Sequence, residues 1–305
     1  MVKERDIKTE LLRTKGEFTS ESMARDLEVG SQAIKQALDE LLEAGYKFID
    51  NGGVYLRSKS SCPSSFDASR MFRDGNLHFG LVSDTHLGSQ KERLDALEMA
   101  YDRFKSDGVS VVFHVGDWMD GVGVYKGQEM EVNQYGQEAQ IDYTIRNYPK
   151  RNGIKTVGIS GNHDLKAYER GGTDPLVQVA RARRDITYIG QYNTDVKLHR
   201  GVNMELMHPM GNTAYALSYK AQRDINNRSP ENLPNILAYG HYHTSYYMHY
   251  RGIDFVQVPC FKDAGYFEKR LGLNPTIGAW IVDGKSDGNE IQNFKPDLFT
   301  FGGRR

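Results

Sequence analysis

Five short apolar runs, each ending in an aspartate or a histidine, constrain the fold from residue 77 onward more than any other feature. Helical patterns at about 91–107, 136–149 and 174–184 accompany the first three runs. Strand-like runs that alternate with helices are typical of an α/β domain with a central sheet covered by helices. Two later runs without a helix between them predict an antiparallel part. The five runs are LHFGLVSD, VSVVFHVGD, IKTVGISGNHD, VNMELMH and NILAYGH, and the two later ones are SYYMHYRG and IDFVQVPC.

The first sixty residues have a different pattern, which predicts a separate small domain. Three groups of apolar residues have helical spacing, and Thr19 or Ser20 and then Ser31 can cap the second and third helices. An alternating segment with Asn51-Gly52 follows and predicts a β-hairpin. The apolar groups are Ile7, Leu11 and Leu12; Met23, Ala24 and Leu27; and Ile34, Leu38, Leu41 and Leu42.

Three short helices followed by a hairpin resemble a winged helix-turn-helix domain. We assign it to residues 1–58, a serine-rich linker to 59–75 and the α/β domain to 76–305. A winged helix places its third helix in the DNA major groove, which makes Gln32, Lys35 and Gln36 candidate DNA contacts. Residues 1–60 contain ten Lys or Arg and eleven Asp or Glu, however, and phosphate contacts dominate DNA affinity. Protein docking or homo-oligomerisation through this domain is therefore an equal alternative.

Composition excludes several classes of protein. The 305-residue chain has a net charge of −1, which gives no global electrostatic reason to bind nucleic acid or a membrane. No apolar stretch approaches the ~20 residues that span a bilayer. The charged N-terminus lacks the apolar core of a signal peptide. Only two cysteines are present, so we expect a reducing, cytoplasmic setting.

The residues that end the five apolar runs are those that bind metal ions. Carboxyl ends of strands in open α/β sheets form a crevice lined by loops, so these side chains are expected to meet there. Carboxylate, imidazole and amide oxygen together suit divalent Mn, Fe, Zn or Ni, and seven ligands can hold two ions if one carboxylate bridges them. The seven candidate metal ligands are Asp84, His86, Asp117, Asn162, His208, His241 and His243.

The ordered series Asp-X-His, Gly-Asp-X-X-Asp, Gly-Asn-His-Asp, His and Gly-His-X-His resembles the calcineurin-like metallophosphoesterase family. The resemblance implies a β-sandwich flanked by helices and two divalent ions, for which we expect manganese. It implies one ion on Asp84, His86, Asp117 and His243, and another on Asp117, Asn162, His208 and His241. It further implies hydrolysis by metal-bound hydroxide, with His163 as general acid and the Asp120 carboxylate orienting His163 and raising its pKa.

Departures from the family patterns narrow the substrate class. Asp120-Gly121 stands where Ser/Thr phosphatases have Asp-Arg-Gly, and Asp164 stands where they have Glu. Purple acid phosphatases place a tyrosine ligand where this chain has Asp120. A phosphodiesterase or nuclease acting on nucleic acid or nucleotides is therefore our first hypothesis. The alternatives are a phosphomonoesterase, acting on a phosphoprotein or a small ester, and a DNA-binding regulator with a vestigial metal domain. Candidate substrate contacts are Lys166, Arg170, Tyr125 and Lys126.

Overall fold

The computed structural model describes residues 7, 10–11, 14, 17–43, 48–50, 54–57, 64–166, 174–229 and 233–302. The chain divides into two compact units, Met1–Pro63 and Ser64–Arg305, which are described separately below.

The first unit contains helices α2 (Ser20–Asp26) and α3 (Ser31–Glu43) and a small antiparallel sheet. Thr19 caps α2 by accepting a hydrogen bond from the Ser22 amide at 3.0 Å, as its sequence predicts. Ile7 and Leu11 are buried in a cluster with apolar residues of α2 and α3, whereas Leu12 lies outside the described residues. The sheet has the order β1-β3-β2, with bounds β1 Glu17–Thr19, β2 Phe48–Asp50 and β3 Val54–Arg57. Its assignment as a winged helix stays a prediction.

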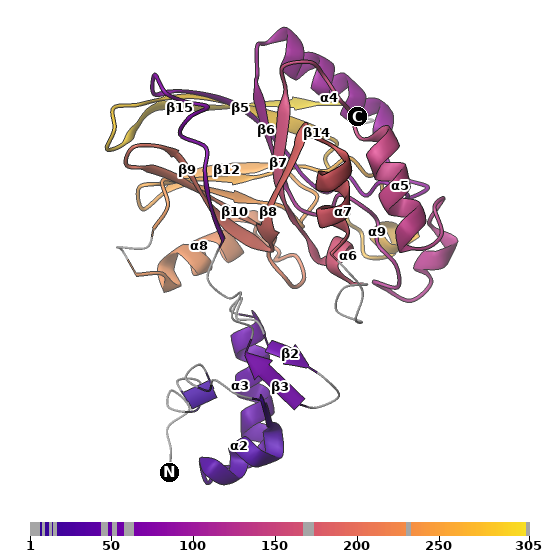
Figure 1. The fold of residues 1–305 in the computed structure, drawn as a ribbon, viewed down its shortest axis with the longest axis vertical. Helices are drawn as coiled ribbons and strands as arrows, with labels where there is room; N and C mark the ends of the chain where they lie inside the picture. The colour runs from indigo at the N-terminus through magenta and orange to yellow at the C-terminus, as the bar shows by residue number, and fades with distance from the viewer. Residues whose placement is uncertain are drawn as a thin grey trace. The chain divides into compact units, whose positions relative to one another are not determined.

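The second unit is built on two six-stranded sheets, which confirms the predicted α/β fold (Figure 1). In one sheet, β5 to β8 are parallel neighbours, with β14 and β15 added antiparallel at one edge. Its order is β15 (Ile291–Thr300), β14 (Gly278–Ser286), β5 (Asn76–Val82), β6 (Val111–Val115), β7 (Lys155–Ser160) and β8 (Ile186–Gln191). All five residues of β6 are buried, as expected of a parallel strand covered on both faces.

The second sheet combines parallel and antiparallel pairs. Its central strands β10, β11 and β13 are parallel, and β9 and β12 pair with them antiparallel. The β12–β13 pair confirms the antiparallel part predicted from the two successive apolar runs. The order is β12 (Tyr246–Tyr250), β13 (Ile253–Gln257), β11 (Ile236–Tyr239), β10 (Val202–Met207), β9 (Asn193–His199) and β4 (Ser64–Asp67).

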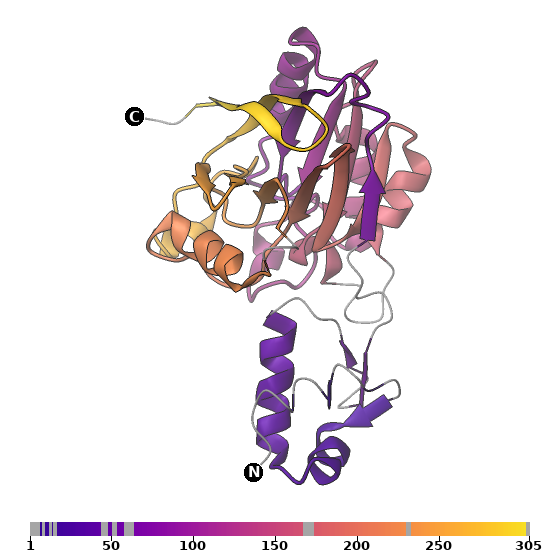
Figure 2. The same ribbon diagram turned by 90° about the vertical axis from the view of Figure 1, so that its left-hand side faces the viewer.

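Helices cover the outer faces of both sheets, so the unit has four layers. The facing sheets bury one apolar cluster that includes Phe79, Phe113 and Met204. On the far side of the first sheet lie α4 (Leu94–Ser106), α5 (Gln137–Asn147) and α7 (Pro175–Ala182), close to the predicted helices (Figure 1). Figure 2 shows α8 (Leu217–Asn227) on the side opposite α7, where Ala221 and Ile225 pack against the second sheet. Three short helices also lie in the described part of this unit: η1 (Gln128–Met130), α6 (Asn162–Leu165) and α9 (Tyr266–Arg270).

The second unit begins earlier than the sequence indicated. β4 lies inside the segment 59–75 assigned to a linker, yet it pairs in parallel with β9 from Ser64 to Asp67. Ala68 and Phe72 in the same segment are buried between the two sheets. The serine-rich composition hid this strand because an edge strand needs few apolar residues. Among the described helices, none is both long and apolar enough to cross a membrane.

Candidate metal centre

The seven candidate ligands follow the carboxyl ends of five strands, and the structure brings them together. Asp84 and His86 follow β5, Asp117 follows β6 and Asn162 follows β7. The second sheet contributes the others, His208 after β10 and both His241 and His243 after β11. Three sets of possible ligand atoms lie within 4.8 Å of one another: Asp84, His86 and His243; His86, Asp117 and His163; and Asp117, His208 and His241.

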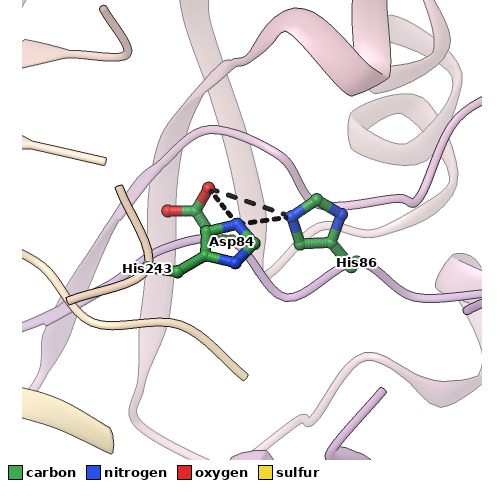
Figure 3. Close-up of side chains that lie close together, drawn as sticks. All are labelled: Asp84, His86 and His243. Carbon is green, nitrogen blue, oxygen red and sulfur yellow. Dashed lines mark hydrogen bonds and ion pairs between the residues drawn. The ribbon is translucent and has the colours of Figure 1, made fainter. Parts of the chain in front are cut away.

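The first set joins loops from both sheets (Figure 3). His243 Nε2 lies 3.3 Å from Asp84 Oδ1 and 3.0 Å from His86 Nε2. Asp84 and His86 are fully buried, and the side chain of His243 is 18% exposed. Figure 3 shows the carboxylate and the two imidazoles directed toward one position, the arrangement that a bound cation requires.

Asp117 lies between the first set and the third. Its Oδ2 is 3.2 Å from His208 Nε2 on one side and 3.8 Å from His86 Nε2 on the other. His208 Nε2 also lies 3.2 Å from Asn162 Oδ1, which adds an amide oxygen to the third set. The placement fits the bridging role that the family resemblance implies for Asp117.

The backbone at these residues is in a conformation that side chains other than glycine avoid. Five candidate ligands have positive φ angles: Asp84 51°, His86 46°, Asp117 55°, His241 75° and His243 54°. Each such residue costs about 1–3 kcal/mol, and conformations of this kind concentrate at functional sites. The surrounding strands and hydrogen bonds, including those from the His241 amide to the Asp84 carboxylate, hold the loops in this strained form. These strained backbone conformations lower the stability of the fold, so their concentration at the candidate ligands indicates a functional site.

Glycines leave the room that the ligands occupy. A Cβ atom at Gly161 would overlap Asp117 Oδ1, and one at Gly116 would overlap His208 Nδ1. Gly116 also has a φ of +91°, whereas Gly161, at −105°, is required for space alone. Gly116 is therefore required both for its backbone conformation and for space, and Gly161 for space.

Burial and neighbouring charges change the pKa values of the candidate ligands in different directions. Burial and nearby imidazoles lower the pKa of His86 and of His241 to about 4, so both rings are neutral near pH 7. Burial opposes ionisation of Asp117, but the His208 and His163 rings outweigh it and hold its pKa well below the usual range. Burial also opposes a charge on His208, but Asp117 and Asp84 raise the pKa of His208 to about 9. The carboxylates therefore attract a positive charge at this position, which a divalent cation would supply more strongly than a proton.

Asp120 does not contact His163 in the way that the family resemblance implied. The Asp120 carboxylate lies 3.1 Å from His86 Nδ1, while His163 Nδ1 lies 2.6 Å from the Asp120 backbone carbonyl. A carbonyl oxygen can only accept, so Nδ1 of His163 carries a proton. The prediction that the carboxylate orients His163 is wrong. Asp120 instead positions the candidate ligand His86 through its side chain and His163 through its backbone.

A buried lysine that the sequence did not single out supports this arrangement. Lys262 is 1% exposed, and its Nζ lies 3.4 Å from Asp120 Oδ1 and 3.1 Å from Glu268 Oε1. Gln128 donates to Asp120 as well, at 3.1 Å from Oδ2. A lysine after a strand has no local pattern that marks it as buried, so this contact could only be found in the folded structure.

Replacing Lys262 with Met should destabilise the protein by about 3–5 kcal/mol, because it leaves Asp120 and Glu268 as buried carboxylates without their cation. Chemical denaturation in the presence of a chelator, monitored by circular dichroism, measures this decrease in the free energy of unfolding. Lys105→Met is the matched control: Lys105 is exposed and donates to the Asn152 carbonyl, so its loss should cost less than about 0.5 kcal/mol. Equal midpoints for the two variants would contradict the ion-pair assignment.

Asp164 ties two ligand loops together. Its carboxylate accepts hydrogen bonds from the amides of Trp118 at 3.2 Å, Met119 at 3.0 Å and Gly161 at 2.9 Å. The loops after β6 and β7 are thereby fixed relative to one another, which positions Asp117 beside Asn162.

The candidate substrate contacts have different surroundings. Tyr125 is half-buried, with its ring centroid 6.4 Å from that of His163 and its hydroxyl donating to Glu131 at 3.1 Å. Lys126 is exposed next to it, and Lys166 is half-buried at the end of α6. Arg170 lies outside the described residues. In the first unit, Gln32, Lys35 and Gln36 are all exposed on α3, and Gln36 donates to Glu40 at 3.1 Å.

Comparisons with known proteins agree with this geometry. Residues 77–259 match the calcineurin-like phosphoesterase superfamily domain. A DNA polymerase II small subunit from Methanothermobacter thermautotrophicus is 25% identical over 65% of this chain and 50% of its own length. One from Halobacterium salinarum is 28% identical over 52% of this chain and 32% of its own length. The chain thus spans half or less of these two relatives.

Among solved structures, an archaeal phosphodiesterase is 15% identical, with a TM-score of 0.44 over 73% of this chain and 100% of that one. The family match covers more than half of the chain and includes every candidate ligand, from Asp84 to His243. The chain therefore belongs to the calcineurin-like phosphoesterase superfamily.

Proposed function

We propose that this protein is a metal-dependent phosphodiesterase that hydrolyses nucleic acid. The observation that carries the proposal is the position of Asp117, whose Oδ2 lies within 4 Å of an imidazole nitrogen from each ligand set, His86 and His208. A carboxylate shared in this way is suited to hold two cations. A vestigial domain would have no need to keep five strained residues at this centre, Asp117 among them, since strain costs stability.

Seven side chains would hold the two ions: Asp84, His86 and His243 on one side, Asn162, His208 and His241 on the other, and Asp117 between them. The chemistry that two divalent ions supply when bound is activation of a water molecule and neutralisation of charge on phosphoryl oxygens. Manganese remains our expectation, because the donors mix carboxylate and amide oxygen with imidazole nitrogen.

His163 has the position of a general acid in this proposal. Its amide donates to Asp117 Oδ1 at 2.9 Å, and its ring lies 4.5 Å from that of His86. Because Nδ1 donates to the Asp120 carbonyl, Nε2 is the nitrogen that exchanges a proton. Protonated at Nε2, it would give that proton to the leaving oxygen as the ester bond breaks.

The names of the curated relatives favour DNA over a phosphoprotein as the partner of this chain, because both are subunits of a DNA polymerase. The absence of the Asp-Arg-Gly pattern at Asp120-Gly121 agrees with a diester rather than a phosphoprotein substrate. A role as an accessory polymerase subunit, which the same names suggest, is compatible with hydrolysis at this centre.

A chelator should abolish hydrolysis, and added Mn²⁺ should restore it. The assay compares bis(4-nitrophenyl) phosphate, 4-nitrophenyl phosphate, and labelled single- and double-stranded oligonucleotides, each with EDTA and with Mn²⁺. Faster cleavage of the diester than of the monoester supports a phosphodiesterase. Hydrolysis that persists undiminished in EDTA would exclude the metal-dependent mechanism, and a preference for the monoester would favour a phosphatase.

A further inference from the structure

The segment that leads from β10 into α8, and that contacts the candidate ligand His241 through Gly211, exposes several large apolar side chains. Within the ten residues 210–219, Met210 is 53% exposed, Tyr215 107%, Leu217 45% and Tyr219 54%. Large side chains held fully in water gain nothing from the hydrophobic effect, and a group of them marks an interaction site.

Cations lie among these aromatic rings. The Arg223 guanidinium carbon is 5.8 Å from the centroid of the Tyr219 ring, and Lys220 Nζ is 5.1 Å from that of Tyr242. Because Ala221 and Ile225 form the buried side of α8, Tyr219 and Arg223, four residues apart, lie together on its exposed side. We call Tyr215, Tyr219, Lys220 and Arg223 the α8 strip.

The α8 strip begins at the candidate metal centre. The carbonyl oxygen of Gly211 lies 2.9 Å from Nε2 of the candidate ligand His241. Lys220 Nζ lies 3.5 Å from the position that a Cβ atom on Gly211 would occupy. Tyr242, whose ring Lys220 covers, follows His241 directly, with 5.2 Å between the two ring centroids. A chain molecule that leaves the metal centre on this side would therefore meet Lys220 and then the exposed tyrosines.

Aromatic rings with cations beside them match a polymer that alternates flat bases and phosphates. Exposed aromatic rings stack on bases, and lysine or arginine neutralises the phosphates between them. The nearby carboxylate of Asp224 does not oppose this, because it is 2.8 Å from Arg228 Nη2. Stacking needs a free base face, which the interior of a duplex does not offer and a single strand does.

We infer that the α8 strip binds a single-stranded polynucleotide whose reacting phosphate lies at the candidate metal centre. This inference rests on the proposed function and adds the form of the substrate and its direction of exit. Tyr215 and Tyr219 would hold bases by stacking, while Lys220 would hold a phosphate near the centre and Arg223 one beside Tyr219.

The test is fluorescence anisotropy of a labelled single-stranded oligonucleotide with the full chain in EDTA, where binding is measured without cleavage. Replacing both rings, Tyr215→Ala with Tyr219→Ala, should weaken binding at least about tenfold, since stacking on each ring contributes severalfold or more. Tyr266→Ala is the matched control, because Tyr266 is 73% exposed on α9, well away from α8 in Figure 1. The control should bind like the unaltered protein.

A second variant keeps the inference open to test if the double variant folds poorly by circular dichroism. Arg223→Gln should reduce the slope of log affinity against log salt by about 0.7, the contribution of one single-strand phosphate contact. Unchanged affinity in the ring variant with an unchanged slope in Arg223→Gln would overturn the inference. Tighter binding of a duplex of the same sequence would overturn it as well.

Hydrolysis of bis(4-nitrophenyl) phosphate by the unaltered protein tests the proposed function separately, because that small diester has one phosphate and no polynucleotide chain to bind along the strip. If the protein hydrolyses the small diester but the strip variants bind the oligonucleotide normally, the proposed function is supported and the binding role of the α8 strip is contradicted. Loss of oligonucleotide binding in the strip variants without any hydrolysis would support the strip and contradict the function.

Discussion

Asp117→Asn should reduce phosphodiester hydrolysis about 1000-fold or more at saturating Mn²⁺. In the proposed centre the Asp117 carboxylate would supply one negative charge shared by two ions, whereas an amide would offer a single neutral oxygen in its place. Two-metal sites contribute several kcal/mol to the transition state, and each 1.36 kcal/mol corresponds to a tenfold change in rate. The amide oxygen can still accept the hydrogen bond from the His163 amide, so the loop should keep its position.

Two measurements accompany this variant. Metal content after dialysis, measured by mass spectrometry, should fall from two ions per chain, since the lost charge weakens both sites. Asp142→Asn is the control, because Asp142 is exposed on α5 and changes the same charge away from the centre. Hydrolysis in Asp117→Asn within about tenfold of the unaltered protein would contradict a bridging role, as would full occupancy with two ions.

His163→Ala should lower kcat about 100- to 10,000-fold on substrates with a poor leaving group, the usual contribution of a general acid. The loss should be much smaller with a nitrophenolate leaving group, which departs without needing a proton. Comparing kcat for an oligonucleotide, whose leaving group is an alkoxide, with kcat for bis(4-nitrophenyl) phosphate measures this difference directly.

The leaving-group dependence separates proton donation from structural effects. His249→Ala provides the control, because His249 lies exposed on β12 with its Nδ1 3.0 Å from Asp254 Oδ1. It should leave both substrates unaffected. Equal losses on the two substrates in His163→Ala would show that His163 holds the site together and does not donate the proton.

The candidate ligands could be found from sequence because each lies next to a strand that its own neighbours specify. A buried parallel strand such as β6 is a continuous apolar run, and Asp117 follows it within two residues. Carboxyl ends of parallel strands lie at one edge, so the approximate convergence of the side chains within each sheet follows from local pattern. The β4 strand escaped prediction because serine-rich edge strands lack that pattern.

The partners of Asp120 illustrate what local pattern leaves open. The family resemblance implies that its carboxylate contacts His163, yet the carboxylate lies against His86 and Lys262. Which neighbour a buried carboxylate takes depends on where a cation is available, and Lys262 comes from a loop after β13, far along the chain. The α8 strip is a similar case, because its position beside His241 depends on how α8 packs against the second sheet.

The sequence by itself determined the α/β class, the strands whose ends carry the ligands, and the ligand types, because these depend on periodicity and on residues adjacent in the chain. Only the tertiary structure decided how the two sheets face each other, which imidazole each carboxylate contacts, and which exposed side chains lie beside the metal centre. The physical reason is that burial and ion pairing depend on which groups lie close together in the folded chain, whatever their separation in sequence. A buried ion pair such as Lys262 with Asp120 is selected by the low-dielectric interior around it, and that interior exists only after segments from the whole unit have packed together.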